Sequence, residues 1–361
     1  MPFLLVNYRN MAPSATPAPK KLLYEVSIIR PIVIGLLVLL HAFTNFYNSG
    51  FNISSSAVGC YRWFSYIISG FRIETIALIA GYVFAFQSLD LGKRYSFGPF
   101  LVKKFKRLII PMLFFGMLYY FLILFDRDTF TFSDFFMQLF TGCGHLWFLP
   151  MLFWCFIAIW IIDHYKLSSW ITLLLLAAFT FIHPSSLPFG FARLPYFLFF
   201  VYGGYFLWIH HDQLQKRCTG VPVIISLWVV YLLLVVVRYQ FLSGVFNGSG
   251  TLQRIMEYLV RNGLALLISC VGIMALYLTV CRFTTRPSFV PRPVVIRASD
   301  YCYGIYVYHQ FVMLPLFFNT PIIYSCNSWI MPWVAFLLTY IISLILTILT
   351  LKTKFGRSLI G

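Results

Sequence analysis

The chain has 361 residues, of which 60% are hydrophobic and only 10% are charged, and it carries a net charge of +17. This composition excludes a soluble globular domain and predicts a polytopic membrane protein. The positive charge is explained by membrane topology and attraction to anionic headgroups, so no nucleic-acid partner is expected. The eight cysteines form no CxxC pair and no His/Cys cluster at zinc spacing, so no metal site is expected either.

Apolar windows separated by polar segments predict an all-α integral membrane protein, a bundle of about ten transmembrane helices. Residues 1–25 are expected to form a cytoplasmic segment without a cleavable signal peptide, residues 26–351 the transmembrane domain, and residues 352–361 a cytoplasmic tail. With both termini cytoplasmic, the inner segments hold most of the Lys and Arg residues, as the positive-inside rule requires. The expected spans are residues 26–46, 63–86, 108–125, 146–162, 168–183, 193–209, 221–239, 259–280, 301–318 and 329–351.

The first expected span, which contains RPIVIGLLVLLH, places two ionisable residues in an apolar helix. Arg30 and His41 are separated by ~1100° of helical rotation, only ~20° beyond three whole turns, so they project from the same face. An ionisable residue at membrane depth is by default a functional-site hypothesis. The alternative is that Arg30 snorkels to the interface and His41 is a hydrogen-bonded interior residue. The spacing alone does not decide between these readings.

Three later spans also carry ionisable residues. The string FRIETIALIAGY places Arg72 and Glu74 well inside the second span, where they diverge by ~200° and therefore each need a partner on another helix. They either pin two helices together or belong to a site. His145 enters the fourth span within GHLWFLP, and His309 lies near the middle of the ninth within SDYCYGIYVYHQ. Interfacial anchoring explains the tryptophan in GHLWFLP but not the histidine.

Basic residues are concentrated in two further places. The inner segment of residues 93–111, KRYSFGPFLVKKFKRLIIP, holds more basic residues than are needed to orient the next span in the membrane. It is either a solvated stop signal or a landing site for a polyanionic cytoplasmic ligand. On the opposite side, arginines at four positions have few acids close in sequence, and either snorkel separately or converge on an anionic acceptor. The residues concerned are Lys103, Lys104, Lys106 and Arg107 in the inner segment, and Arg72, Arg193, Arg238 and Arg261 on the opposite side.

The Arg30-x10-His41 pair, FRIETIALIAGY, the basic run before RLIIP, GHLWFLP and SDYCYGIYVYH resemble, in order and spacing, the membrane acyltransferase family 3 proteins. These are bacterial O-acyltransferases of cell-surface glycans, and the resemblance covers residues 22–351. It implies a ten-helix fold in the bacterial inner membrane and an acyl-CoA donor, typically acetyl-CoA, used from the cytoplasm without a permanently bound cofactor. It also implies a glycan or lipid-linked sugar acceptor acylated at the outer face.

By position, the resemblance makes His41 the catalytic histidine and Arg30 its partner. Lys104 and Arg107 occupy the family's Arg-x-x-Arg positions, and the lysine keeps the charge but loses the bidentate fork. Ala80 stands where the family often has serine. No esterase-like domain follows the last span, which indicates a stand-alone member.

Acyl transfer to a sugar hydroxyl needs a base for the hydroxyl proton and a group that stabilises the oxyanion. His41 is the predicted base, and Arg30 is expected to hold the donor's phosphate or pantetheine end. No G-x-S-x-G motif offers a competing nucleophile. The alternative is a secondary transporter or a lipid or glycan flippase, which would also bury charges among ten spans, although no inverted repeat is visible. The residues expected to bind substrate are Arg72, Glu74, His145, His309, Arg193 and Arg261.

Overall fold

The computed structural model describes residues 23–48, 55–93, 96–182, 187–241, 250–286, 289–290, 292–318 and 327–361. Within these ranges the chain is helical and contains no β-strand. Seven helical stretches in them are long and apolar enough to cross a membrane: Tyr24–Tyr47, Ser56–Asp90, Phe97–Leu124, Gly144–His164, Val221–Gln240, Thr251–Thr284 and Met331–Lys352.

The fifth, sixth and ninth expected spans are helices that fall outside this set. Helix α8 (Trp170–Phe179) has only 10 residues, which rise about 15 Å, half the thickness of a hydrocarbon core. Helices α9 (Leu194–Cys218) and α13 (Pro293–Phe318) have 25 and 26 residues and are long enough to span. Both contain several tyrosines and at least one histidine, and these polar residues lower their hydropathy.

The second expected span is broken in two. Helix α2 (Ser55–Ser69) ends at Gly70, and α3 (Arg72–Ala85) starts two residues later, followed by the π-helical turn η1 (Phe86–Asp90). A Cβ atom on Gly70 would lie 2.6 Å from the Tyr231 hydroxyl oxygen, so glycine permits this close approach. The break places Arg72 and Glu74 in the first turn of α3 instead of mid-helix.

The third expected span starts earlier than the sequence indicated. Helix α4 (Phe97–Lys104), η2 (Phe105–Ile109), α5 (Ile110–Tyr119) and η3 (Tyr120–Leu124) follow one another without a gap. Residues 97–107, which the sequence placed before this span, are therefore helical. Lysine and arginine are good helix formers, so a basic run does not by itself end a helix.

The closest helix crossing joins α3 and α9. A Cβ atom on Gly81 would lie 1.7 Å from the Val201 carbonyl oxygen, and one on Gly204 would lie 1.8 Å from the Leu78 carbonyl oxygen. The two backbones therefore touch, as small residues allow in membrane helix pairs.

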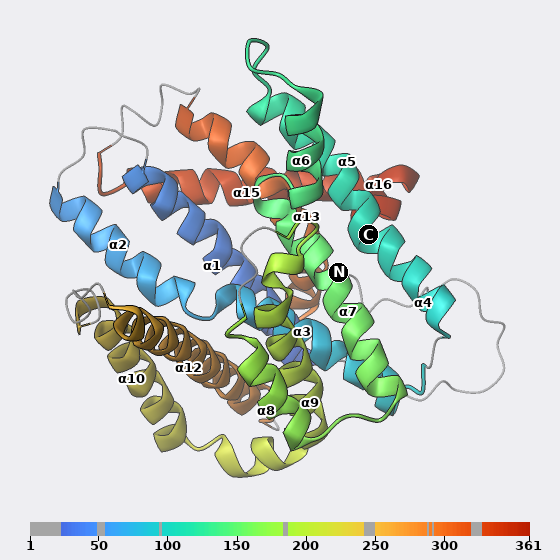
Figure 1. The fold of residues 1–361 in the computed structure, drawn as a ribbon, viewed down its shortest axis with the longest axis vertical. Helices are drawn as coiled ribbons and strands as arrows, with labels where there is room; N and C mark the ends of the chain where they lie inside the picture. The colour runs from blue at the N-terminus through green and yellow to red at the C-terminus, as the bar shows by residue number, and fades with distance from the viewer. Residues whose placement is uncertain are drawn as a thin grey trace.

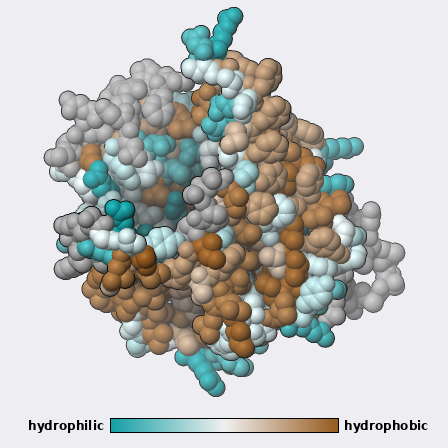
Figure 2. Space-filling model, in the orientation of Figure 1, coloured by the Kyte–Doolittle hydropathy of each residue, from teal (hydrophilic) through white to brown (hydrophobic). Residues whose placement is uncertain are grey.

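Helix α1 (Tyr24–Asn48) has a central place. It contacts α2, α3, α12 (Thr251–Thr284), α13 and α15 (Met331–Lys352). In Figure 1, α8, α9, α10 and α12 occupy the lower part of the view, and α4 and α5 lie along its right side. The surface over α10 and α12 is largely hydrophobic, whereas hydrophilic residues gather in a hollow at the upper left (Figure 2). The remaining elements are α6 (Phe132–Thr141), η4 (Gly144–Trp147), α7 (Phe148–His164), η5 (Phe191–Arg193), α10 (Val221–Val236), η6 (Val237–Phe241) and α16 (Lys354–Ile360).

Candidate active site

Three histidines from distant parts of the chain meet inside the bundle. The ring of His309 in α13 lies 5.2 Å from that of His41 in α1 and 4.7 Å from that of His145 in η4, measured between centroids. His309 is fully buried and His145 nearly so, whereas His41 is partly exposed. Of the three rings, His41 is therefore the most exposed.

Backbone carbonyls orient the two buried rings. His309 Nδ1 lies 2.6 Å from the Tyr306 carbonyl oxygen, and His145 Nε2 lies 2.9 Å from the Val307 carbonyl oxygen. A carbonyl only accepts hydrogen bonds, so each of these nitrogens carries the proton of a neutral ring. The other two nitrogens, His309 Nε2 and His145 Nδ1, are buried without a hydrogen-bond partner among the described residues. They present lone pairs within the cluster.

Local backbone geometry explains how His145 reaches this place. Gly142 and Gly144 have φ angles of 88° and 57°, a left-handed conformation that glycine adopts without strain. A Cβ on Gly144 would lie 2.8 Å from the Tyr119 ring. The Tyr306 hydroxyl donates a hydrogen bond to the His145 carbonyl oxygen and ties η4 to α13. No group of three or more His, Cys, Asp or Glu in the described part of the chain is placed to hold a metal ion.

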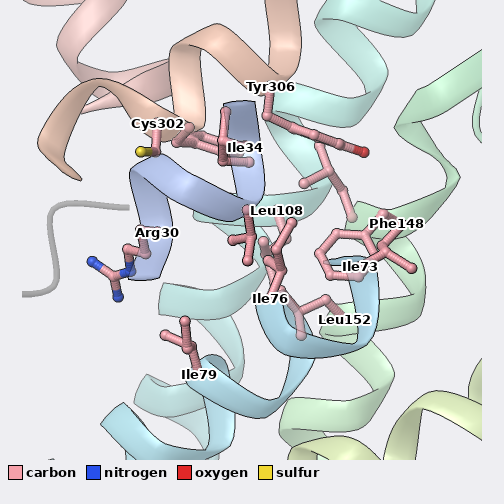
Figure 3. Close-up of a pocket in the computed structure, with 13 residues that line it drawn as sticks. Arg30, Ile34, Ile73, Ile76, Ile79, Leu108, Phe148, Leu152, Cys302 and Tyr306 are labelled. Atoms are coloured by element: carbon pink, nitrogen blue, oxygen red, sulfur yellow. The ribbon is translucent and has the colours of Figure 1, made fainter. Parts of the chain in front are cut away.

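Arg30 lies beside a small apolar cavity. The cavity has a volume of about 50 Å³, and its lining includes Arg30, Cys302 and Tyr306. Figure 3 shows Arg30 at one side, the Tyr306 hydroxyl directed toward Phe148 at the other, and aliphatic side chains between them. The Tyr306 ring is in turn 6.0 Å from that of His309. Arg30 and His41 thus both face α13, as expected from their spacing.

The basic run ahead of the third span divides into two pairs. Lys103 and Lys106 are exposed, whereas Lys104 is buried and Arg107 is partly buried. The Lys104 ammonium lies 3.2 Å from the Phe156 ring centroid, in a cation–π contact. Arg107 Nη1 donates a 2.8 Å hydrogen bond to the backbone oxygen of Gly361 and lies within electrostatic range of Arg30. Lys104 and Arg107 are thus held by contacts within the protein, whereas Lys103 and Lys106 are exposed.

Glu74 finds its partner on α9. Its Oε1 accepts a hydrogen bond of 3.3 Å from the Tyr196 hydroxyl, which also lies 3.2 Å from Ser269 Oγ. Ser269 Oγ donates to the Gly70 carbonyl oxygen at 2.7 Å, so this network links α3, α9, α12 and the helix break. Arg72 forms no ion pair with Glu74 within the described ranges, but its charge lies within electrostatic range of both Glu74 and His41.

The other arginines expected on this side occupy two places. Arg193 lies over the Trp147 ring, 3.6 Å from its centroid. Arg261 pairs with Glu257 at 2.6 Å, and together with Arg238 it lines a pocket that Arg193 does not reach. Sequence reasoning missed Tyr306 and Tyr196 as polar supports. The three-residue spacing of Tyr303, Tyr306 and His309 on one face of α13 was a usable signal for the first, whereas nothing local marked Tyr196.

The family model described as an acyltransferase domain matches residues 23–352, nearly the whole chain. Fold and family together define an integral-membrane acyltransferase. The chain belongs to acyltransferase family 3, the family that its motifs resemble. No curated protein and no solved structure matched the chain.

Proposed function

We propose that the protein transfers an acyl group, typically acetyl, from cytoplasmic acyl-CoA to a hydroxyl of a glycan or lipid-linked sugar at the outer face of the bacterial inner membrane. In this proposal α8, α9 and α13 are inserted in the membrane together with the seven longer apolar stretches, which makes ten. Both termini are then cytoplasmic. The observation that carries the proposal is the cluster of His41, His145 and His309, with Arg30 on the same helix as His41 and beside an apolar cavity.

The donor approaches along the face that α1 shares with α13. Arg30 and His41 are about 16 Å apart along the helix axis, a separation that an extended pantetheine arm bridges. Arg30 and Arg107 hold the anionic end of the donor, and arginine suits this because its guanidinium binds phosphate bidentately. The cavity of about 50 Å³ is smaller than the arm. Side chains such as Leu152 therefore move when the donor enters.

His41 acts as the general base. It removes the proton of the acceptor hydroxyl while the hydroxyl oxygen attacks the thioester carbonyl carbon, and the new C–O bond forms as a tetrahedral oxyanion develops. Arg72, which lies within electrostatic range of His41, stabilises that oxyanion. The C–S bond then breaks, and the protonated His41 returns its proton to the departing CoA thiolate. Atoms and charges balance without a further reactant.

The buried histidines position His41. His309 Nδ1 is bonded to a carbonyl, so His309 Nε2 acts only as an acceptor toward its neighbours. This nitrogen has no hydrogen-bond partner among the described residues. In the proposed mechanism it accepts the N–H of His41 when the substrates bind, and the other nitrogen of His41 is then directed at the acceptor hydroxyl. His145 supports the same arrangement through its bond to the Val307 carbonyl oxygen.

His41→Ala tests this function. Loss of a general base costs about 10²- to 10⁴-fold in rate, so transfer of radiolabelled acetyl groups from acetyl-CoA in membranes is expected to fall by at least 100-fold at equal protein level. His164→Ala is the matched control, because His164 is an exposed histidine stacked on Trp160 in α7. Transfer above about a tenth of wild type in His41→Ala would reject His41 as the base.

A further inference from the structure

A pocket separate from the histidine cluster opens between α2, α12 and the π-helical turn η6. It has a volume of about 480 Å³, and its lining includes Tyr66, Ser69, Arg238, Tyr239 and Arg261. Ligand pockets for small molecules are typically about 300–1,000 Å³, so one saccharide unit fits. No step of the proposed donor pathway uses this pocket.

The charge of the pocket is positive. Arg238 and Arg261 come from different helices and face the same space. Glu257 contacts Arg261 Nε at 2.6 Å and balances one of the two charges. Arg238 makes no ion pair with any residue that the structure describes, although Glu74 lies within its electrostatic range. One cation is thus left for an anionic ligand, and two guanidinium groups from different directions suit a phosphate or a carboxylate.

One wall of the pocket is aromatic. Tyr66 and Tyr239 are in ring contact, and Trp63 lies 5.0 Å from Tyr239 and 6.3 Å from Tyr66 between ring centroids. The C–H faces of pyranose rings pack against such aromatic surfaces, and the tyrosine hydroxyls offer hydrogen bonds at the edge. Guanidinium groups beside an aromatic wall therefore match a sugar that carries a negative charge better than they match a bare inorganic anion.

Polar residues connect this pocket to Glu74 in α3. Gly70 lines the pocket, and its carbonyl oxygen accepts the hydrogen bond of Ser269, which leads through Tyr196 to Glu74. Arg72, in the same turn of α3 as Glu74, lies within electrostatic range of His41. The break between α2 and α3 thus links the pocket by hydrogen bonds to Glu74, two residues after Arg72.

We propose that this pocket binds an anionic saccharide, with its phosphate or carboxylate on Arg238 and Arg261 and its ring against Tyr66 and Tyr239. The inference rests on the proposed acyl transfer and names the class of the acceptor. Arg193, over Trp147, lies outside the pocket and has no part in this binding.

Binding measurements on purified His41→Ala protein separate recognition from catalysis. Glucose 1-phosphate and glucuronate are expected to bind more tightly than glucose and inorganic phosphate in isothermal titration, with affinity falling as salt rises. Arg238→Gln is expected to weaken binding of the two anionic sugars by about tenfold or more. Arg254→Gln is the matched control, because Arg254 is exposed on the same face of α12 as Arg261, seven residues earlier. This variant should bind the two anionic sugars as tightly as the His41→Ala protein does.

Three results would overturn the inference. The first is that glucose and glucose 1-phosphate bind equally well. The second is that the Arg238 and Arg254 substitutions change binding equally. The third is that phosphatidylglycerol, added to the detergent micelles that hold the purified protein, displaces the sugar phosphate. The last would identify a site for lipid headgroups. Failure here is distinct from failure of the proposed function, because His41-dependent transfer from acetyl-CoA is measured separately. Absence of sugar binding with intact transfer would reject only the pocket.

Discussion

At the scale of single residues, the environment separates three chemically identical side chains. His41 lies on the helix that sequence reasoning singled out and is partly exposed, whereas backbone carbonyls hold His145 and His309. When a backbone carbonyl accepts a hydrogen bond from one nitrogen of a neutral histidine ring, it fixes the tautomer, and the second nitrogen can then only accept a hydrogen bond. In the proposed mechanism the cluster therefore has one residue that exchanges protons with substrate, His41, and two that orient it.

The orienting role of His309 predicts a graded response to substitution. His309→Leu removes the acceptor at the Nε2 position and is expected to lower kcat for transfer by about tenfold or more, with little effect on the KM for acetyl-CoA. His309→Gln keeps an acceptor oxygen near that position and should recover part of kcat. Steady-state kinetics on membranes with matched protein content measures both. If Leu and Gln were equally active, His309 would be a packing residue only.

At the scale of elements, breaks in helices and close contacts between them decide which side chains meet, more than helix lengths do. The gap at Gly70 turns one expected span into two helices and brings Glu74 to Tyr196. Acidic residues are favoured in the first turn of a helix by its dipole, so the break also gives Glu74 a better position than mid-helix. Where the chain crosses itself most closely, between α3 and α9, glycines replace side chains.

The α3–α9 crossing predicts opposite outcomes for adjacent glycines. Gly204→Ala places a methyl group where the Leu78 carbonyl oxygen now lies, 1.8 Å away, so the helices must separate. Overpacking of this kind costs about 1–3 kcal/mol. A lower melting temperature in detergent and reduced transfer are expected. Gly203→Ala has no atom within 4 Å of the new methyl group and should melt like wild type or slightly higher. Equal melting temperatures for the two variants would contradict the crossing.

At the scale of the whole molecule, the distribution of charge predicts how the bundle lies in the membrane. The last turn of α9, next to the α9–α10 connection, holds Lys216 and Arg217, while Arg254 lies in the first turn of α12, which follows α10 in the chain. A connection rich in Lys and Arg is retained in the cytoplasm. The proposed orientation therefore places Lys216 inside and Arg254 outside.

Cysteine labelling tests this orientation. Arg254→Cys should react in intact cells with a membrane-impermeant maleimide, above the level of the unsubstituted protein. Lys216→Cys should react only after the inner membrane is permeabilised, because the reagent cannot cross the bilayer. Both side chains are exposed, so differences in burial do not confound the comparison. The reverse pattern would invert the proposed sides for donor and acceptor.

The sequence by itself determined the membrane class, the acyltransferase family and the shared face of Arg30 and His41. Composition determines whether a chain folds in a membrane or in water, and helical periodicity determines which residues share a face of a helix. It also indicated His145 and His309, because a histidine at membrane depth is costly without a role. These inferences depend on local pattern, which tertiary contacts do not alter.

Only the tertiary structure decided which of these residues meet. His41, His145 and His309 converge because α1, η4 and α13 pack together, and no spacing within one helix encodes such contacts between distant segments. The same holds for Glu74 with Tyr196 and for the division of the basic run around Lys104. A charge in a sequence shows that a partner is needed, and only the packing of helices selects that partner.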